Sequence, residues 1–237
     1  MIELYDTKIK YYPDGNIRYS CNKIIIPYNN FSYSPAKDNK SKDTDIIRSK
    51  RNSLNRSVDK LYDIVHSNTW DYFFTLTLDP GKVDRYDFIL SSNCVHHFTD
   101  LLYRSDCLYV IVPEKHKDGA WHFHGLLTNT DNLKLVVNDN GYFEFKQYNY
   151  GYCSLSRVVD TNKVANYILK YLIKGYDFLD IPKGKKRYWA SRGLDIPDVE
   201  YDVLTIDQIN DLLNKSYYYK KIDNDFYKGY IIDVNEN

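Results

Sequence analysis

The stretch that decides the fold is CLYVIVPEKHKDGAWHFHGLLT, residues 107–128. Two largely apolar runs, CLYVIVPE (107–114) and WHFHGLLT (121–128), flank a short polar segment that contains Asp118-Gly119. Apolar runs separated by a short glycine-containing loop are typical of a β-hairpin. The stretch therefore predicts two antiparallel strands.

The second of these strands carries two histidines on one face. Because alternate residues of a strand share a face, His122 and His124 point together, whereas Trp121 and Phe123 point the other way. Two imidazoles on one face can hold a divalent metal ion, and a carboxylate would complete three ligands and leave positions open. The pattern favours a metal site, although His-Phe-His also arises by chance on sheet surfaces.

The length of the loop decides whether Glu114 joins the two histidines. A two-residue loop would place Glu114 on the face away from them. A three-residue loop, Lys117-Asp118-Gly119, pairs His116 with Ala120 and places Glu114 opposite His122, with the loop glycine in the left-handed conformation. We predict the three-residue loop, which makes Glu114 the third ligand and His116 a lesser candidate.

Residues 160–175 carry the clearest helical pattern, with Asp160 or Thr161 as N-cap and Gly175 at the end. One arc of about 100° on this helix is polar and contains Tyr167, Lys170, Tyr171 and Lys174. The opposite side is apolar, which predicts that it is buried, and consists of Ala165, Ile168, Leu169, Leu172 and Ile173.

Taken alone, this pattern fits an amphipathic helix with two half-exposed tyrosines. A tyrosine hydroxyl, with an ordinary pKa near ~10, needs help to act as a nucleophile. A metal that polarises a phosphodiester, with a lysine to offset the developing charge, supplies such help. The helix and the hairpin together therefore predict attack by a tyrosine on a DNA phosphate.

The remaining segments alternate between strands and helices. We predict a polar loop over 29–45, helices over 46–65, 86–103 and 205–216, a strand over 71–78, and hairpins over 133–148 and 217–235. The expected fold is α+β, with a central antiparallel sheet flanked by helices and a small C-terminal appendage. The expected domains are an N-terminal strand and loop (1–45), an endonuclease domain (46–197), and an acidic helix and hairpin (198–237).

Composition limits the class of protein further. The 237 residues contain 32 basic and 32 acidic side chains, but residues 195–237 hold ten acidic and four basic ones, which leaves a net charge of +6 in 1–194. A basic body suits phosphate contacts. No run approaches the ~20 apolar residues of a membrane helix, and the first residues resemble no secretory signal. Four scattered cysteines without a C-x-x-C pair are typical of free intracellular thiols.

These motifs resemble those of the HUH endonucleases, specifically the rolling-circle replication initiators of small phages and plasmids. FFTLTLDP (73–80) is similar to the first motif of that family, and WHFHGLL (121–127) to its His-hydrophobe-His motif. NYILKYLIK (166–174) resembles the two-tyrosine motif, and KRYWASRGL (186–194) a segment that follows it. The resemblance covers about residues 70–195.

The resemblance implies a central antiparallel sheet with the metal hairpin at its middle and the tyrosine helix across its face. It implies strand-specific nicking of single-stranded DNA, often at an origin hairpin, through a 5′-phosphotyrosine, with Mg²⁺ or Mn²⁺ as cofactor. Lys174 is added from its place on the helical face. The expected site comprises metal ligands His122, His124 and Glu114, nucleophiles Tyr167 and Tyr171, and lysines Lys170 and Lys174.

The resemblance also bears on partners. No G-x-x-x-x-G-K-[ST] sequence occurs, so a separate helicase, supplied by a bacterial host, would unwind the DNA in the cytoplasm. Backbone contacts are expected from Lys183, Lys185, Lys186 and Arg187, and from a basic helix around Arg48, Lys50, Arg51 and Arg56, unless these are ordinary solvated faces. Tyr188 and Trp189 either stack on bases or, for Trp189, belong to the core.

Two alternatives stay open at this point. The same chemistry would serve a two-tyrosine transposase or a mobilisation relaxase, although relaxases usually carry their tyrosine ahead of the histidine motif. A different class is a non-enzymatic binder of single-stranded nucleic acid that uses a similar sheet with exposed aromatic residues.

Overall fold

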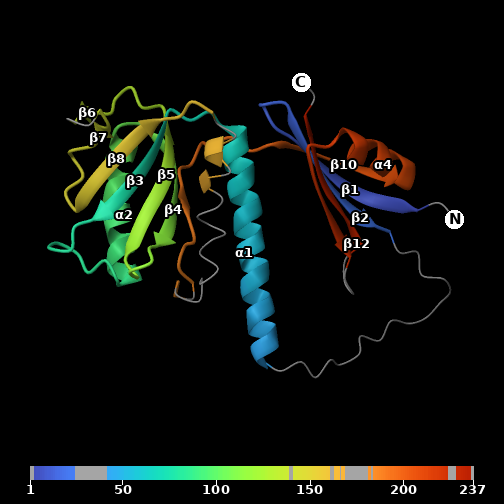
Figure 1. The fold of residues 1–237 in the computed structure, drawn as a ribbon, viewed down its shortest axis with the longest axis horizontal. Helices are drawn as coiled ribbons and strands as arrows, with labels where there is room; N and C mark the ends of the chain where they lie inside the picture. Colours follow the sequence, from blue (N-terminus) through green and yellow to red (C-terminus); the bar gives the residue numbers. More distant parts are fainter. Residues whose placement is uncertain are drawn as a thin grey trace. The chain divides into compact units, whose positions relative to one another are not determined.

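The computed structural model describes residues 3–24, 42–138, 141–160, 163–165, 167–168, 181–182, 184–223 and 228–235. It divides into two compact units: one comprises Met1–Arg51 with Ile196–Asn237, and the other Asn52–Asp195. Both units contain an antiparallel sheet with helices (Figure 1), which confirms the predicted α+β class. None of the described helices is both long and apolar enough to cross a membrane.

The unit Asn52–Asp195 is built on a seven-stranded antiparallel sheet with the order β6-β7-β8-β3-β5-β4-β9. The predicted metal hairpin, β4 with β5, lies inside this sheet rather than at its edge, as the resemblance implies. The strands are β3 (Tyr72–Leu78), β4 (Leu108–Lys115), β5 (Trp121–Thr128), β6 (Val136–Val137), β7 (Phe143–Glu144), β8 (Gly151–Arg157) and β9 (Trp189–Ala190).

Helix α2 (Phe88–Arg104) packs on one face of this sheet (Figure 1). Asp87 begins the helix as its N-cap, because its carboxylate accepts the backbone N–H groups of Ile89 and Leu90. The buried side of α2 meets the inward residues of the strands, and this cluster includes Phe74, Leu76, Phe98, Leu102, Phe123 and Leu155. The predicted helix over 86–103 is therefore confirmed.

The other face of the sheet is covered by the C-terminal part of α1 (Lys42–Ser67) and by the start of the tyrosine helix. The apolar residues that α1 presents to the sheet recur at helical spacing, as predicted: Leu54, Leu61, Ile64 and Val65. Ala165 and Ile168 are fully buried against the same cluster, which confirms the predicted apolar side of the tyrosine helix at these two positions.

Trp189 settles an alternative that the sequence left open. Its side chain is only 4% exposed, and its ring lies edge-on to Phe123 with the centroids 5.8 Å apart. Trp189 therefore belongs to the core that α2 covers, and stacking of Trp189 on bases is wrong. Tyr188, its neighbour, packs partly buried against the cluster on the opposite face.

The other unit joins the two ends of the chain in one sheet with the order β10-β1-β2-β12-β11. The sequence analysis separated residues 1–45 from 198–237 and did not predict this pairing. Helix α4 (Ile206–Lys215) packs on the sheet and begins with a capping box between Thr205 and Gln208. The strands are β1 (Leu4–Tyr11), β2 (Asn16–Lys23), β10 (Asp198–Thr205), β11 (Tyr218–Asp223) and β12 (Lys228–Asn235).

All four cysteines, Cys21, Cys94, Cys107 and Cys153, are free and buried, as the sequence predicts. Burial raises the pKa of Cys21 to about 11 and that of Cys107 to about 12. Both thiols are therefore protonated and unreactive near neutral pH.

Gly125 fixes how closely the central strands and the core can approach. A Cβ at this position would lie 2.3 Å from the Val110 carbonyl oxygen and 2.4 Å from the Phe74 ring. We expect Gly125→Ala to lower the free energy of unfolding by about 1–3 kcal/mol, because neither a backbone carbonyl nor a buried ring can move aside freely. Urea denaturation measures the change, with Thr128→Ala at the end of the same strand as control. An unfolding midpoint equal to that of the parent protein would contradict this account.

Candidate active site

The hairpin loop has the predicted length. Glu114 pairs directly with His122 in the register of β4 and β5. The His116 N–H donates to the Ala120 carbonyl at 2.8 Å, and the Gly119 N–H donates to the His116 carbonyl at 2.8 Å. Gly119 has φ +90°, the left-handed conformation expected for the loop glycine. The three-residue loop is confirmed, and with it the place of Glu114 on the histidine face.

Neighbouring strands extend this face on both sides of the histidines. Thr77, His122 and Glu114 form one cross-strand row on β3, β5 and β4, and Thr75 stands beside His124 in the next row. Strand alternation sends Trp121 and Phe123 into the α2 core, as the sequence predicts.

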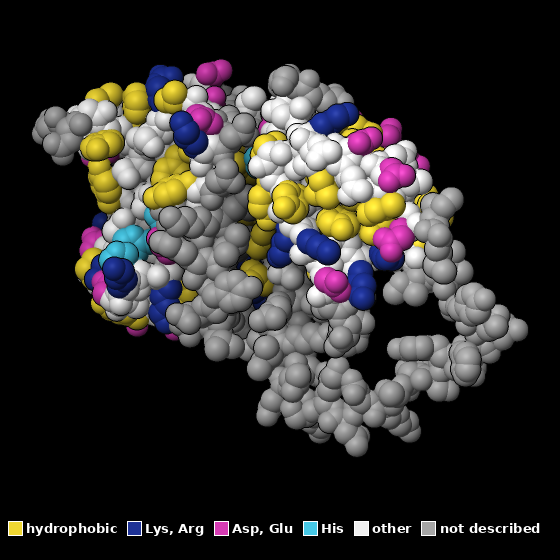
Figure 2. All heavy atoms as spheres, turned by 45° about the vertical axis from the view of Figure 1, so that its right-hand side comes forward, with side chains coloured by type: hydrophobic (Ala, Val, Ile, Leu, Met, Phe, Trp, Pro, Cys, Tyr) yellow, Lys and Arg dark blue, Asp and Glu magenta, His cyan; other side chains and the backbone are white. Residues whose placement is uncertain are grey.

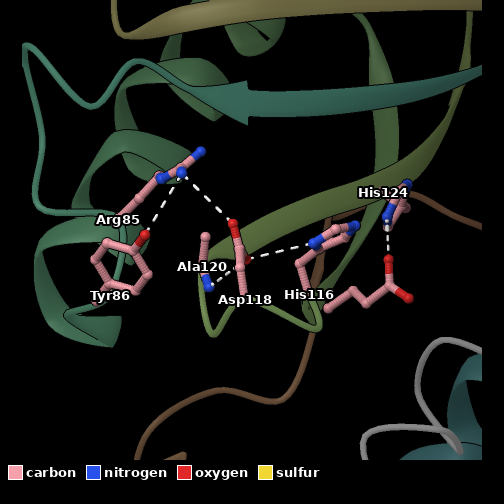
Figure 3. A network of polar contacts seen from close by, with 7 residues as sticks. Arg85, Tyr86, His116, Asp118, Ala120 and His124 are labelled. Atoms are coloured by element: carbon pink, nitrogen blue, oxygen red, sulfur yellow. Dashed lines mark hydrogen bonds and ion pairs between the residues drawn. The ribbon is translucent and has the colours of Figure 1, made fainter.

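His124 is held at both ring nitrogens. Its Nε2 is hydrogen-bonded to Glu114 Oε2 at 2.8 Å, and its Nδ1 to Thr75 Oγ1 at 3.1 Å (Figure 3). The residue is only 7% exposed, and this burial lowers the pKa of the imidazole, with the Glu114 carboxylate opposing the shift. The lowered pKa favours the neutral ring, which is the form that binds a metal.

His122 sits nearer the end of the hairpin and contacts a different group. Its ring stacks on His116 with centroids 5.2 Å apart. Burial, followed by the neighbouring His116, lowers the pKa of His122, which again favours the neutral ring. Figure 2 shows histidine side chains reaching the surface beside lysine or arginine side chains.

A chain of polar contacts ties the hairpin loop to the segment before α2 (Figure 3). Asp118 Oδ1 lies 3.3 Å from His116 Nδ1, and Asp118 Oδ2 lies 3.5 Å from the Arg85 guanidinium. The Ala120 N–H also donates to Asp118 at 3.0 Å, and the Trp121 N–H donates to the Arg85 carbonyl at 2.8 Å. These contacts fix the loop that positions His116 against His122.

The three predicted ligands are of the right chemical kinds but are not arranged as a ligand set. Within the described part of the chain, no group of three or more His, Cys, Asp or Glu side chains is placed to hold a metal ion. Glu114 instead bonds His124, and His122 stacks on His116. The structure thus brings the predicted donors to one face, and their role as ligands stays a prediction.

Tyr167 lies on the same side of the sheet as the histidines. Its side chain is 43% exposed, and its ring meets Phe73 edge-on with centroids 5.4 Å apart. The Phe73 ring in turn stacks on His124 at 5.9 Å. Phe73 therefore connects the tyrosine to the metal-ligand candidate. The other predicted residues of this helix, Lys170, Tyr171 and Lys174, lie outside the described residues.

The predicted DNA-binding residues differ in exposure. Lys185 and Lys186 are exposed, as is Arg56 on α1. Arg187 is half-buried, and burial lowers the pKa of its guanidinium below the ordinary value. Lys183 and the side chains of Arg48, Lys50 and Arg51 lie outside what the structure describes.

Sequence reasoning missed Phe73, Thr75, Arg85 and Asp118 as parts of the site. Phe73 and Thr75 belong to a predicted strand, but their place beside His124 depends on the pairing of β3 with β5 across 49 residues. The alternation of FFTLT offered one signal, because a small hydroxyl residue stands where the face would otherwise be apolar. Arg85 gave no signal.

Comparison with known proteins adds one match. The family of the replication-associated protein ORF2 matches residues 71–176, just under half of the chain. The matched region contains β3, the metal hairpin and the tyrosine helix. The match supports a Rep-type replication initiator that acts on DNA as an endonuclease. No curated protein and no solved structure gave a significant match.

The contact between Thr75 and His124 leads to a prediction. We expect Thr75→Val to weaken Mn²⁺ binding by about 10–100-fold, because the hydroxyl on Nδ1 fixes the ring orientation that leaves Nε2 for the metal. Calorimetric titration with Mn²⁺ measures the change. Thr77→Val, one row along the same strand face, is the matched control. Equal affinities in the two variants would show that Thr75 does not orient the ring.

Proposed function

We propose that the protein initiates rolling-circle replication by nicking and rejoining single-stranded DNA through a 5′-phosphotyrosine. The single observation that carries the proposal is that Tyr167 and the His122–His124–Glu114 group lie on one face of one sheet, connected through Phe73. The family match supports the replication role and spans both elements.

The proposed reaction is a transesterification at phosphorus. The Oη atom of Tyr167 or Tyr171 attacks the phosphate, and the bond from phosphorus to the 3′ oxygen breaks. The phenol loses its proton, and the departing 3′ oxygen gains one, so that a free 3′-hydroxyl and a 5′-phosphotyrosine result. The reverse step, with a 3′-hydroxyl as attacking group, rejoins the strand. The exposure of Tyr167 makes its hydroxyl accessible to a DNA strand.

A divalent cation, Mg²⁺ or Mn²⁺, would polarise the phosphate when it is bound. His122, His124 and Glu114 are the residues that would hold it, since two neutral imidazoles and a carboxylate suit such an ion. Binding requires that Glu114 and His124 exchange their mutual hydrogen bond for bonds to the ion. Thr75 then keeps the His124 ring in place.

The lysines of the tyrosine helix offset the charge that develops on the phosphate. Lys170 and Lys174 share the helical arc of Tyr167 and Tyr171, so they would face the same strand of DNA. Lys185 and Lys186, which are exposed, would contact the DNA backbone.

A cleavage assay tests the proposal. A pool of single-stranded oligonucleotides, each with a 5′ label, is incubated with the full chain and Mn²⁺. The proposal predicts a shorter labelled fragment that a polymerase can extend, because its 3′ end is a hydroxyl. A protein that binds the pool but yields no fragment would instead be a non-enzymatic binder, and the proposal would be wrong.

A further inference from the structure

The unit that joins the chain ends has a sheet whose two faces differ. Tyr5 and Ile9 of β1 and Leu204 of β10 pack with Ile209 of α4 in one hydrophobic cluster. Because side chains alternate along each strand, the residues between them lie on the opposite face. One cross-strand row of that opposite face runs through all five strands and consists of Tyr201, Lys8, Ser20, Ile231 and Lys220. We call this side the Tyr201 face.

Aromatic rings are exposed on the Tyr201 face. Tyr201 is 71% exposed and Tyr218, in the adjacent row on β11, is 49% exposed. The Nζ atom of Lys8 lies 6.0 Å above the centroid of the Tyr201 ring. This contact holds a positive charge next to a ring that has solvent on much of its surface.

Charge is distributed unequally between the two faces. The strand registers place Lys8, Lys10, Arg18 and Lys220 on the Tyr201 face against only Asp6 and Asp233, and Asp233 pairs with Arg18 at 2.7 Å. On β10 the acids Asp198, Glu200 and Asp202 all lie on the α4 face, while Val199, Tyr201 and Val203 lie on the other. A strand rich in acids thus offers none of them to the Tyr201 face.

We infer that the Tyr201 face is a second binding surface, and that its partner is single-stranded DNA. Exposed rings on a sheet stack on unpaired bases, and lysines beside them contact the phosphates. The face is complementary to such a strand in charge and offers rings for stacking. The inference goes beyond the nicking reaction, because it concerns a sheet that contains none of the proposed catalytic residues.

Duplex DNA and a second copy of the chain fit the same surface less well. A duplex keeps its bases stacked inside, where a flat sheet face cannot reach them. Two Tyr201 faces placed against each other would oppose lysines to lysines, which disfavours self-association.

The test measures binding without cleavage. Full-length protein in EDTA is titrated against fluorescein-labelled dT20, and anisotropy is followed at several salt concentrations. We expect the pair Lys8→Gln with Lys220→Gln to raise Kd about tenfold and to reduce the salt slope by about 1.4, since each lost phosphate contact contributes about 0.7. Tyr201→Ala should raise Kd at least about fivefold through lost stacking.

Matched controls come from the other face of the same strand. Tyr219→Ala and Lys221→Gln change residues on β11 that are also exposed but lie on the α4 face, and they should leave Kd unchanged. Lys220→Glu gives a second test at an exposed position that does not depend on packing. Thermal unfolding verifies that each variant folds.

Three results would overturn the inference. The first is equal dT20 affinity for the Tyr201-face variants and the parent protein. The second is equally strong competition by a 20-base-pair duplex. The third is a change of sedimentation coefficient in the Tyr201-face variants with unchanged DNA affinity, which would show that the face binds another copy. None of these depends on nicking, so the proposed reaction stands or falls separately.

Discussion

A protein in which both Tyr167 and Tyr171 are replaced by phenylalanine should no longer cleave DNA. We expect the rate to fall at least about 1,000-fold, because no second nucleophile of the same kind remains on the helical arc. Binding of single-stranded DNA should be nearly unchanged, since phenylalanine keeps the ring and removes only the hydroxyl. The edge-on contact of residue 167 with Phe73 should survive for the same reason.

Denaturing gel electrophoresis of labelled oligonucleotides with Mn²⁺ measures the rate. Tyr103→Phe is the matched control, because Tyr103 is 81% exposed on α2, which packs on the opposite face of the sheet. It should cleave like the parent protein. If the double variant still nicks, the nucleophile is another residue.

The second large effect is expected at the metal hairpin. His122→Ala should lower cleavage by about 100-fold or more and weaken Mn²⁺ binding in parallel, because a ligand that polarises the phosphate through the metal is lost. His122 is half-buried at the surface of the sheet, so its loss should leave the fold intact.

Mn²⁺ titration by calorimetry and the cleavage assay together test this effect. His97→Ala is the control, because His97 stacks on Tyr150 at 5.0 Å and belongs to α2 on the other face. A variant with reduced cleavage but an unchanged metal titration would refute His122 as a ligand.

The local parts of this fold could be predicted from the sequence. The loop at Lys117-Asp118-Gly119 decides the register of β4 and β5 because only one loop length puts the glycine in the left-handed conformation and Glu114 opposite His122. Helix α4 could be predicted in the same way, since Thr205 and Gln208 form a capping box next to an apolar stripe.

Pairings between distant segments could not be predicted. Tyr5 of β1 pairs with Leu204 of β10 across almost the whole chain, and no local pattern encodes that register. The same limit hid Thr75 and Phe73, whose contacts with His124 depend on how β3 aligns with β5. The site was therefore predicted where a hairpin or a helix defines it and missed where a sheet does.

The central claim is that a tyrosine of this chain becomes joined to DNA. The most direct measurement is mass spectrometry of the chain after incubation with single-stranded oligonucleotides and Mn²⁺, followed by nuclease and protease digestion. The account predicts a nucleotide phosphate on a peptide that contains Tyr167 or Tyr171. Cleaved DNA without any such adduct, or an adduct on a different residue, would contradict it.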